Sequence, residues 1–245
     1  MDTKVIFKSV GTCFKYASFV FLVPVIVSLI YGEYFAMPYF FLSFLVALIL
    51  GLFLEKVFYT ERTTRFEEGF VIVALIWMVM TLISTIPFVF VSGTGFVDAL
   101  FESMSAWTTT GFSLLDLETT PYSILFWRSF AQWVGGIGIV VLALSGLFKT
   151  SNTLYIIEGH ERIKPNVINA VKTIWWIYIF YTIIGITLLF VAGMPLFDSV
   201  NHAMTGIATG GMGTHSGSIG FYNSPAIESV MMFIMILGGI SFFMH

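Results

Sequence analysis

The sequence predicts an all-α membrane protein, in which two N-terminal transmembrane helices precede two parallel membrane–pore-helix–membrane repeats. Two observations predict this class. Hydrophobic residues make up 58% of the 245 residues and charged residues only 10%, whereas soluble domains carry about 25% charged residues. In addition, one polar segment occurs at 98–113 and again at 198–213, each time between long apolar stretches.

The apolar stretches define the transmembrane helices, because a helix needs roughly 20 apolar residues to cross a bilayer. Six spans are predicted, at 14–31, 36–54, 69–92, 124–148, 168–193 and 225–245. The first two form a hairpin through the turn at 32–34. The predicted domains are an N-terminal transmembrane hairpin with its cytoplasmic loop at 1–68, a first pore repeat at 69–148, a cytoplasmic linker at 149–167 and a second pore repeat at 168–245.

The repeated polar segments predict two short helices, at 98–108 and 198–208. A helix of about eleven residues rises only about 16 Å, which is half a membrane, so each must re-enter on the side it came from. Flanking sequences match as well, since Phe90–Gly93 precedes the first copy and Phe190–Gly193 the second. This is an internal duplication, and both copies face the membrane the same way because each contains two full spans.

The charges set the orientation. Ten of the eleven basic residues fall on one side of the predicted spans, which is therefore cytoplasmic. The short helices open from the other side beneath an acidic rim that attracts cations, and Asp98 and Asp198 are predicted to cap them. The remaining basic residue, Arg128, either extends to the outer interface or pairs with Glu102 or Glu118.

Each short helix ends in a Thr/Gly loop, and these two loops are the candidate site. Non-helical backbone at membrane depth is tolerated only when it is buried in protein or lines a watery cavity. Carbonyl groups that point into such a cavity replace the water shell of a cation, and potassium sheds its water more readily than sodium. An ordinary turn is the alternative. The predicted potassium filter consists of Thr109, Thr110, Gly111, Phe112, Thr209, Gly210, Gly211 and Met212.

Two glycine pairs, in Gly135–Gly138 and at Gly238–Gly239, are predicted to pack helices closely, with a gating hinge as the alternative. The single cysteine excludes an intrachain disulfide, and the four histidines show no metal-site spacing. No convergent acid, base or metal cluster indicates an enzyme. We therefore expect no bound cofactor, only potassium as the transported substrate, and no nucleic-acid partner.

Several motifs resemble the Trk/Ktr/HKT superfamily of potassium transporters, most closely its TrkH-type subunit. They are Asp98–Ser103, Thr108–Gly111, Gln132–Ala143, Ala208–His215, Ser218–Pro225 and Leu237–Phe242. The resemblance implies that Gly111 and Gly211 are filter glycines of the first two of four repeats around one pore. Glycine rather than serine at 111 implies a preference for potassium.

The resemblance also implies a multi-pass protein of the bacterial inner membrane that takes up potassium, passively or by symport. A TrkA-type cytoplasmic nucleotide-binding regulatory subunit is the expected partner, with contacts at 55–68 and 149–167. Members of the superfamily are about twice as long as this chain. We therefore expect a fragment, with a truncated subunit or half of a two-fold homodimer as alternatives. The alternative function is a non-conducting truncated membrane subunit that assembles with or regulates a full-length transporter.

Overall fold

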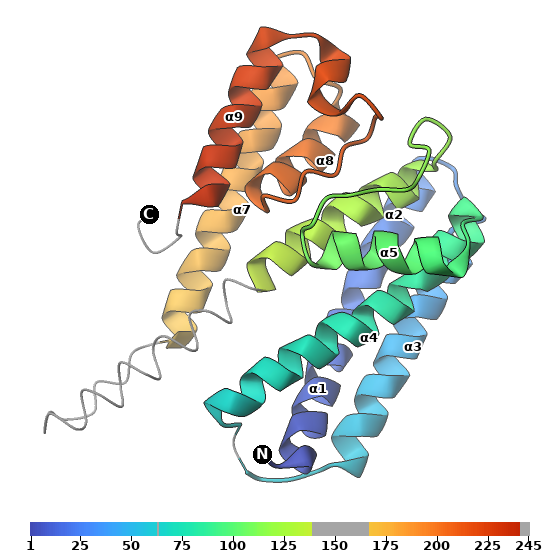
Figure 1. Ribbon diagram of the computed structural model, residues 1–245, viewed down its shortest axis with the longest axis vertical. Coiled ribbons are helices and arrows are strands. Elements are labelled where there is room, and N and C mark those ends of the chain that lie inside the picture. Colours follow the sequence, from blue (N-terminus) through green and yellow to red (C-terminus); the bar gives the residue numbers. More distant parts are fainter. Residues whose placement is uncertain (63, 139–166, 241–245) are drawn as a thin grey trace, which may run out of the picture.

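The computed structural model describes residues 1–62, 64–138 and 167–240, and every regular element in these ranges is helical (Figure 1). The labelled elements are α1 (Thr3–Ala17), η1 (Ser18–Leu22), α2 (Val23–Ile30), α3 (Met37–Val57), α4 (Phe66–Ser92), α5 (Phe96–Trp107), α7 (Val167–Val191), α8 (Leu196–Ile207), η2 (Ser218–Tyr222) and α9 (Pro225–Gly239). Residues 122–138 form a further helix. The sequence-based assignment of an all-helical protein is therefore confirmed for the described residues.

Four helical segments are long and apolar enough to cross a membrane: Thr3–Ile30, Met37–Val57, Glu67–Ser92 and Lys172–Val191. They correspond to the first, second, third and fifth predicted spans. The first begins earlier than predicted, because Asp2 caps it by accepting a hydrogen bond from the Lys4 amide at 3.0 Å. The other two predicted spans are helical at 122–138 and 225–239, and residues 139–148 and 241–245 of these spans lie outside the described ranges. The predicted linker at 149–167 also lies outside them, except for its last residue.

The N-terminal hairpin packs α1 directly against α3 through two glycines. A Cβ on Gly51 would lie 2.6 Å from the backbone nitrogen of Lys15 and 2.9 Å from the carbonyl oxygen of Gly11. A Cβ on Gly11 would lie 2.8 Å from the carbonyl oxygen of Gly51. Small residues of this kind allow helix backbones in a membrane to touch. Near this crossing, Lys15 pairs with Glu55 at 3.1 Å.

The turn of the hairpin is fixed to the first repeat. Glu33 accepts hydrogen bonds from the backbone amides of Tyr122 at 2.7 Å and Ser123 at 2.8 Å. These amides begin the 122–138 helix, where backbone donors have no partner within the helix. The side chain of Glu33 therefore caps a helix about ninety residues further along the chain, and it anchors the N-terminal end of that helix.

Two apolar clusters form the core. One contains Phe14, Phe40 and Trp127 and joins the hairpin to α4, α5 and the 122–138 helix. The other contains Ile137, Tyr178 and other residues of α7, α8 and α9. The 122–138 helix contributes to both clusters, and it lies between the two groups of helices in Figure 1. It is therefore the connection between the N-terminal and C-terminal parts of the fold.

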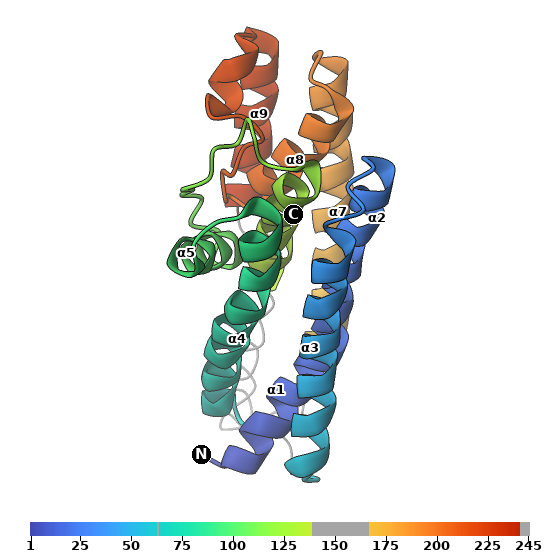
Figure 2. The same cartoon turned by 90° about the vertical axis from the view of Figure 1, so that its right-hand side faces the viewer.

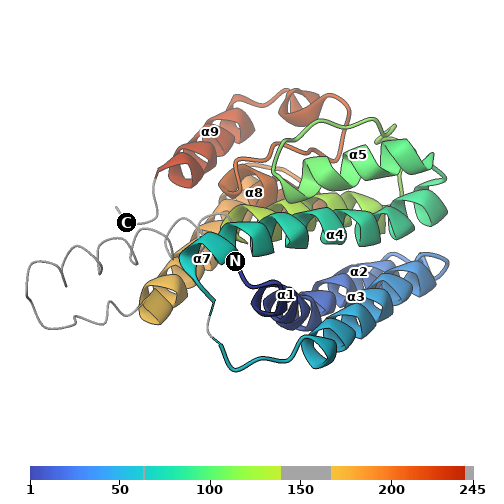
Figure 3. The same cartoon turned by 60° about the horizontal axis from the view of Figure 1, so that its bottom comes forward.

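The short helices α5 and α8 each contain 12 residues. Figure 2 shows α5 nearly end-on while α3 and α4 run lengthwise, so α5 crosses them at a steep angle. In Figure 3, α4 lies between the α1–α3 hairpin and α5. The C-terminal end of α5, where the first Thr/Gly loop begins, lies against the 122–138 helix at Gly135.

The prediction that Asp98 and Asp198 cap the short helices is wrong. The helices begin at Phe96 and Leu196, and Gly95 and Pro195 occupy the capping positions without a side-chain hydrogen bond. Both capping residues have extended backbone angles, with ψ of 152° and 147°, so the chain turns into each helix one residue after them. The two aspartates lie in the first helical turn, where a carboxylate still interacts favourably with the helix dipole.

The α1–α3 contact predicts that Gly51→Ala destabilises the protein by about 1–3 kcal/mol, because the added methyl group overpacks a backbone contact. Thermal unfolding of the purified protein in detergent measures this change. Gly69→Ala in α4 is the matched control, since a Cβ there meets no atom within 4 Å. Equal unfolding temperatures for the two variants would contradict the close contact.

Candidate functional site

The two Thr/Gly loops have the same backbone shape. Thr109 and Thr209 adopt positive φ angles of 54° and 52°, which are uncommon for residues with a side chain. Gly111 and Gly211 follow with φ of 87° and 83°. A glycine is needed at these two places because a Cβ disfavours such angles. The duplicated sequence therefore folds into duplicated loops.

Hydrogen bonds at the ends of the short helices also match. Three consecutive backbone amides in each loop turn back onto the preceding helix, those of Thr108, Thr109 and Thr110 after α5 and those of Ala208, Thr209 and Gly210 after α8. Their distances lie between 2.8 and 3.2 Å. These three amides of each loop are therefore used within its own repeat.

The carbonyl oxygens behave differently. Within the described residues, no donor reaches the carbonyl oxygens of Thr110, Gly111, Gly210 or Gly211. Thr110 and Gly211 are exposed, Gly111 is partly exposed and Gly210 is buried. Because no described donor occupies these four oxygens, each is available as an acceptor for a cation or ordered water.

The two loops touch each other. A Cβ on Gly111 would overlap the carbonyl oxygen of Gly210 and would lie 3.2 Å from its carbonyl carbon. The structure thus brings predicted site residues from both repeats into direct contact, although they lie about one hundred positions apart in the sequence.

Glycines hold the helix ends in place at matching positions. A Cβ on Gly135 would overlap the carbonyl oxygen of Trp107, the last residue of α5, and a Cβ on Gly238 would overlap that of Ile207, the last residue of α8. In addition, Gly136 lies against Ala208, with 3.1 Å between its Cβ position and the Ala208 side chain. These contacts support the first interpretation of the glycine pairs, which was close packing.

Arg128 forms a buried ion pair with Glu102, with 3.2 Å between Nε and Oε2 and with exposed fractions of 1% and 0%. This confirms one of the two partners considered for Arg128 and excludes its extension to the outer interface. Glu102 also accepts hydrogen bonds from the amides of Leu114 and Leu115, and Arg128 donates to the carbonyl oxygen of Gly213 at 3.2 Å. The pair therefore links the segments that follow the first and the second loop.

Position 202 corresponds to position 102 in the repeat, and a histidine occupies it. His202 is buried, and its Cε1 lies 3.3 Å from the Cβ position of Gly213. In the part of the chain that the structure describes, its Nε2 has no hydrogen-bond partner. The two repeats therefore use different side chains to support the segment after the loop.

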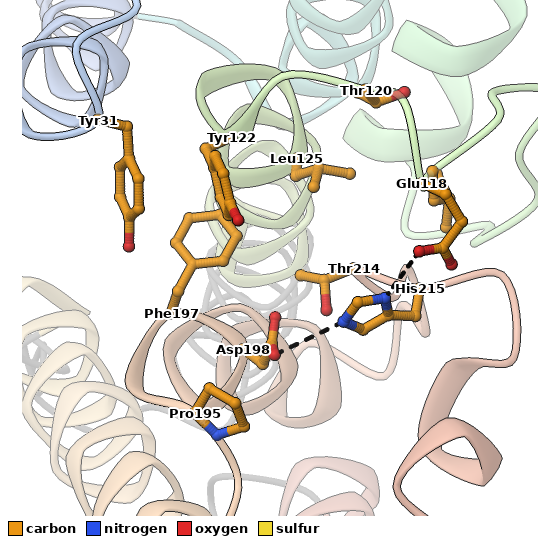
Figure 4. A pocket seen from close by; sticks show the side chains of 11 residues that line it. Tyr31, Glu118, Thr120, Tyr122, Leu125, Pro195, Phe197, Asp198, Thr214 and His215 are labelled. Atoms are coloured by element: carbon orange, nitrogen blue, oxygen red, sulfur yellow. Dashed lines mark hydrogen bonds and ion pairs between the residues drawn. The ribbon is translucent and has the colours of Figure 1, made fainter.

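A pocket of about 430 Å³ lies at the start of α8 (Figure 4). His215 bridges two carboxylates in it, with 3.2 Å from Nδ1 to Glu118 and 3.7 Å from Nε2 to Asp198. The Ser216 amide also donates to Glu118 at 3.2 Å. The pKa of Glu118 is held below its usual value, first by this amide and then by His215. Part of the predicted acidic rim is thus engaged in a contact between the two repeats.

Three contributors to this site were not found from the sequence: Gln132, His202 and His215. Gln132 lies one turn after Arg128 on the same helix, and its Oε1 accepts a hydrogen bond from the Met212 amide at 3.2 Å. Arg128 and Gln132 are four positions apart, so they lie on one face of this mainly apolar helix, and this spacing could have indicated their shared role. The histidines have no such spacing.

The buried ion pair predicts that Arg128→Met lowers the free energy of unfolding by about 3–5 kcal/mol, because Glu102 is left buried and unpaired. The double variant Glu102→Gln/Arg128→Met is expected to lose less, since an amide oxygen still accepts from the loop amides. Thermal unfolding in detergent compares them with Lys56→Gln, a change at an exposed residue of α3. The single variant Glu102→Gln is measured as well. If the double variant loses as much unfolding free energy as the two single variants together, the pairing is contradicted.

The His215–Glu118 contact predicts a dependence on pH. Because the pKa of Glu118 is lower in the folded protein than in the unfolded chain, its carboxylate stabilises the fold above the unfolded pKa. This contribution disappears as the pH falls through the lower folded-state pKa. Glu118→Gln is therefore expected to lower the unfolding temperature at about pH 7 and to lower it by progressively less as the pH falls toward about 3. Glu61→Gln, in the α3–α4 loop, is the control. The role of Glu118 would be contradicted if Glu118→Gln lowered the unfolding temperature equally at both pH values, or if Glu61→Gln showed the same dependence on pH.

Comparisons with known proteins agree with the resemblance seen in the sequence. Residues 37–245 match the model of the TrkH family, described as a cation transport protein. An uncharacterized cation transporter of Methanocaldococcus jannaschii is 42% identical over 237 residues, which cover 91% of this chain and 48% of that protein. The Trk system potassium uptake protein TrkH of Salmonella typhimurium is 35% identical, covering 100% of this chain and 53% of the relative.

Among solved structures, the potassium transporter TrkH from Vibrio parahaemolyticus superposes with a TM-score of 0.80 at 33% identity. The match covers 96% of this chain and 49% of the transporter. The chain therefore spans about half the length of the relatives it matches. Its apolar helices agree with a multi-pass membrane protein, and the match over residues 37–245 identifies it as a member of the TrkH family of cation transport proteins.

Proposed function

We propose that this chain forms two walls of a potassium uptake pore, in which carbonyl oxygens of Thr109–Phe112 and Thr209–Met212 replace the hydration shell of the ion. The observation that carries this proposal is the contact between the two loops, together with the four carbonyl oxygens that accept no hydrogen bond from the described residues. Carbonyl rings of this kind select cations in membrane proteins.

In this proposal, α5 and α8 are pore helices. A helix of 12 residues rises about 18 Å, which is too short to cross a bilayer of about 30 Å. Their C-terminal ends lead into the loops, and the negative end of each helix dipole stabilises a cation there. The domain boundaries expected from the sequence stay predictions, and α4 begins at Phe66, three residues before the expected start of the first repeat.

Two walls do not enclose an ion, so the remaining walls come from elsewhere. The chain spans about half the length of its relatives, and the Salmonella relative is a potassium uptake protein. We propose that the other walls belong to a longer product of the same gene or to a second copy of this chain in a homodimer. A location in the bacterial inner membrane, symport and a TrkA-type regulatory partner stay predictions.

One segment predicted to contact that partner is engaged within the chain. Arg62 lies 3.0 Å from Asp2 and 3.3 Å from Glu68, so its charge holds the loop between α3 and α4 against the start of α1. A regulatory subunit that binds this loop would therefore meet an Arg62 side chain that is already paired with two carboxylates.

Rubidium uptake in a potassium-starved host without its own uptake systems tests the proposed function. We expect uptake when the chain is expressed in an assembly that supplies four loops, either its dimer or the longer gene product. The alternative is a non-conducting subunit, which would show no uptake by itself but would change the uptake of a coexpressed full-length transporter. That second result would contradict the proposal.

Selectivity gives a residue-level prediction. Gly111→Ser is expected to reduce the preference for potassium over sodium by about tenfold, equivalent to about 1.4 kcal/mol, because a side chain at this angle displaces the carbonyl of Gly210. The permeability ratio in the conducting assembly measures it. Gly93→Asn is the matched control, since Gly93 has a φ of 68° but lies at the end of α4, where a Cβ meets no atom within 4 Å. An unchanged ratio for Gly111→Ser would refute the filter assignment.

A further inference from the structure

We propose that Gln132 is a positioning residue that sets the separation of the two Thr/Gly loops, and through it the preference for potassium over sodium. The inference about selectivity rests on the proposed function, whereas the positioning role is a property of the fold. The size of a carbonyl site and the number and field of its oxygens decide which cation it favours. A side chain that fixes the distance between two loops therefore acts on selectivity without touching the ion.

The acceptor side of the Gln132 amide holds the second loop. Gln132 is fully buried in the 122–138 helix, and its Oε1 accepts a hydrogen bond from the Met212 amide at 3.2 Å. This contact also fixes the orientation of the side chain, because a flipped amide would place two donors against the Met212 donor. Met212 follows directly after Gly211, so this bond holds the end of the second loop.

The same amide group lies flat against Gly210. A Cβ on Gly210 would lie 2.5 Å from Cδ and 2.7 Å from Nε2 of Gln132. Gly210 has no positive φ, in contrast to Gly111 and Gly211. The glycine at 210 is therefore explained by the space that Gln132 occupies rather than by its backbone angle.

The donor side of the amide faces the first loop. Nε2 lies 3.9 Å from the Cβ position of Gly111, and it has no hydrogen-bond partner among the described residues. A buried amide nitrogen without a partner is unusual in folded proteins. The Gln132 side chain thus lies against both Gly111 of the first loop and Gly210 of the second, at the place where the loops meet.

The second repeat does not reproduce this residue. The alignment that pairs Gly135 with Gly238 pairs Gln132 with Met235, which is 53% exposed on α9. An apolar residue of similar length is therefore compatible with the helix at this position of the repeat. The polar group at 132 serves the loop backbone and not the packing of the helix.

Two substitutions separate the functions of the amide. Gln132→Met removes both the acceptor and the donors and introduces the residue found at the matching position. Gln132→Glu keeps an oxygen for the Met212 amide but removes the donors that face Gly111. Met235→Leu is the control, because it alters the matching position outside the contact between the loops.

Hydrogen–deuterium exchange of the loop at 209–213 in the detergent-purified chain measures positioning and requires no ion flow. We expect Gln132→Met to speed exchange of the Met212 amide by about tenfold, the effect of losing one buried hydrogen bond, while Gln132→Glu and Met235→Leu retain the slow exchange. Unchanged exchange in Gln132→Met would overturn the positioning role. If Gln132→Met does not fold, fast exchange in Gln132→Glu overturns it instead.

The rubidium-to-sodium uptake ratio of the conducting assembly measures the consequence. We expect both Gln132 variants to lower this ratio and Met235→Leu to preserve it. A normal ratio in Gln132→Met together with faster exchange would overturn the link to selectivity. If the unsubstituted assembly shows no selective uptake while exchange still depends on Gln132, the proposed function fails and the positioning role stands.

Discussion

The free carbonyl oxygens of the two Thr/Gly loops are the constraint on which the rest of the structure depends. At the ends of α5 and α8 the loop amides turn back onto their own helices, whereas the carbonyl oxygens of Thr110, Gly111, Gly210 and Gly211 accept nothing from the described residues. Unpaired backbone groups cost several kcal/mol in hydrocarbon. A protein that buries such loops in a membrane must therefore give their oxygens a polar partner, and a cation that has lost its water is such a partner.

The 122–138 helix holds this arrangement together. Its Arg128 contacts Gly213, its Gln132 contacts Met212 and its Gly136 lies against Ala208, so one face of a helix in the first repeat shapes the loop of the second. Glu33 caps the beginning of the same helix. The N-terminal hairpin thereby contributes to the position of the loops although it lies far from them in sequence.

The sequence predicted what its repeat and its local patterns encode: four of the six apolar spans, in the part of the chain that the structure describes, and the two short helices. The Arg128–Glu102 pair was only one of the alternatives predicted for Arg128, because the partner of a buried charge depends on how the helices are placed relative to one another. The capping role of Asp98 and Asp198 was wrong, since the extended backbone of Gly95 and Pro195 starts each helix earlier. Gln132 and the His215–Glu118 contact depend on segments about 80 to 100 positions apart, which no spacing within one segment reveals.

The central claim is that the two loops form one shared cation site. Anomalous diffraction from crystals of the conducting assembly grown in rubidium tests it most directly. The account predicts an anomalous peak within coordination distance of carbonyl oxygens from both loops, at the contact between Gly111 and Gly210, and no comparable peak when sodium replaces rubidium. Rubidium bound only in the outer pocket near Glu118 and Asp198, with none between the loops, would contradict it.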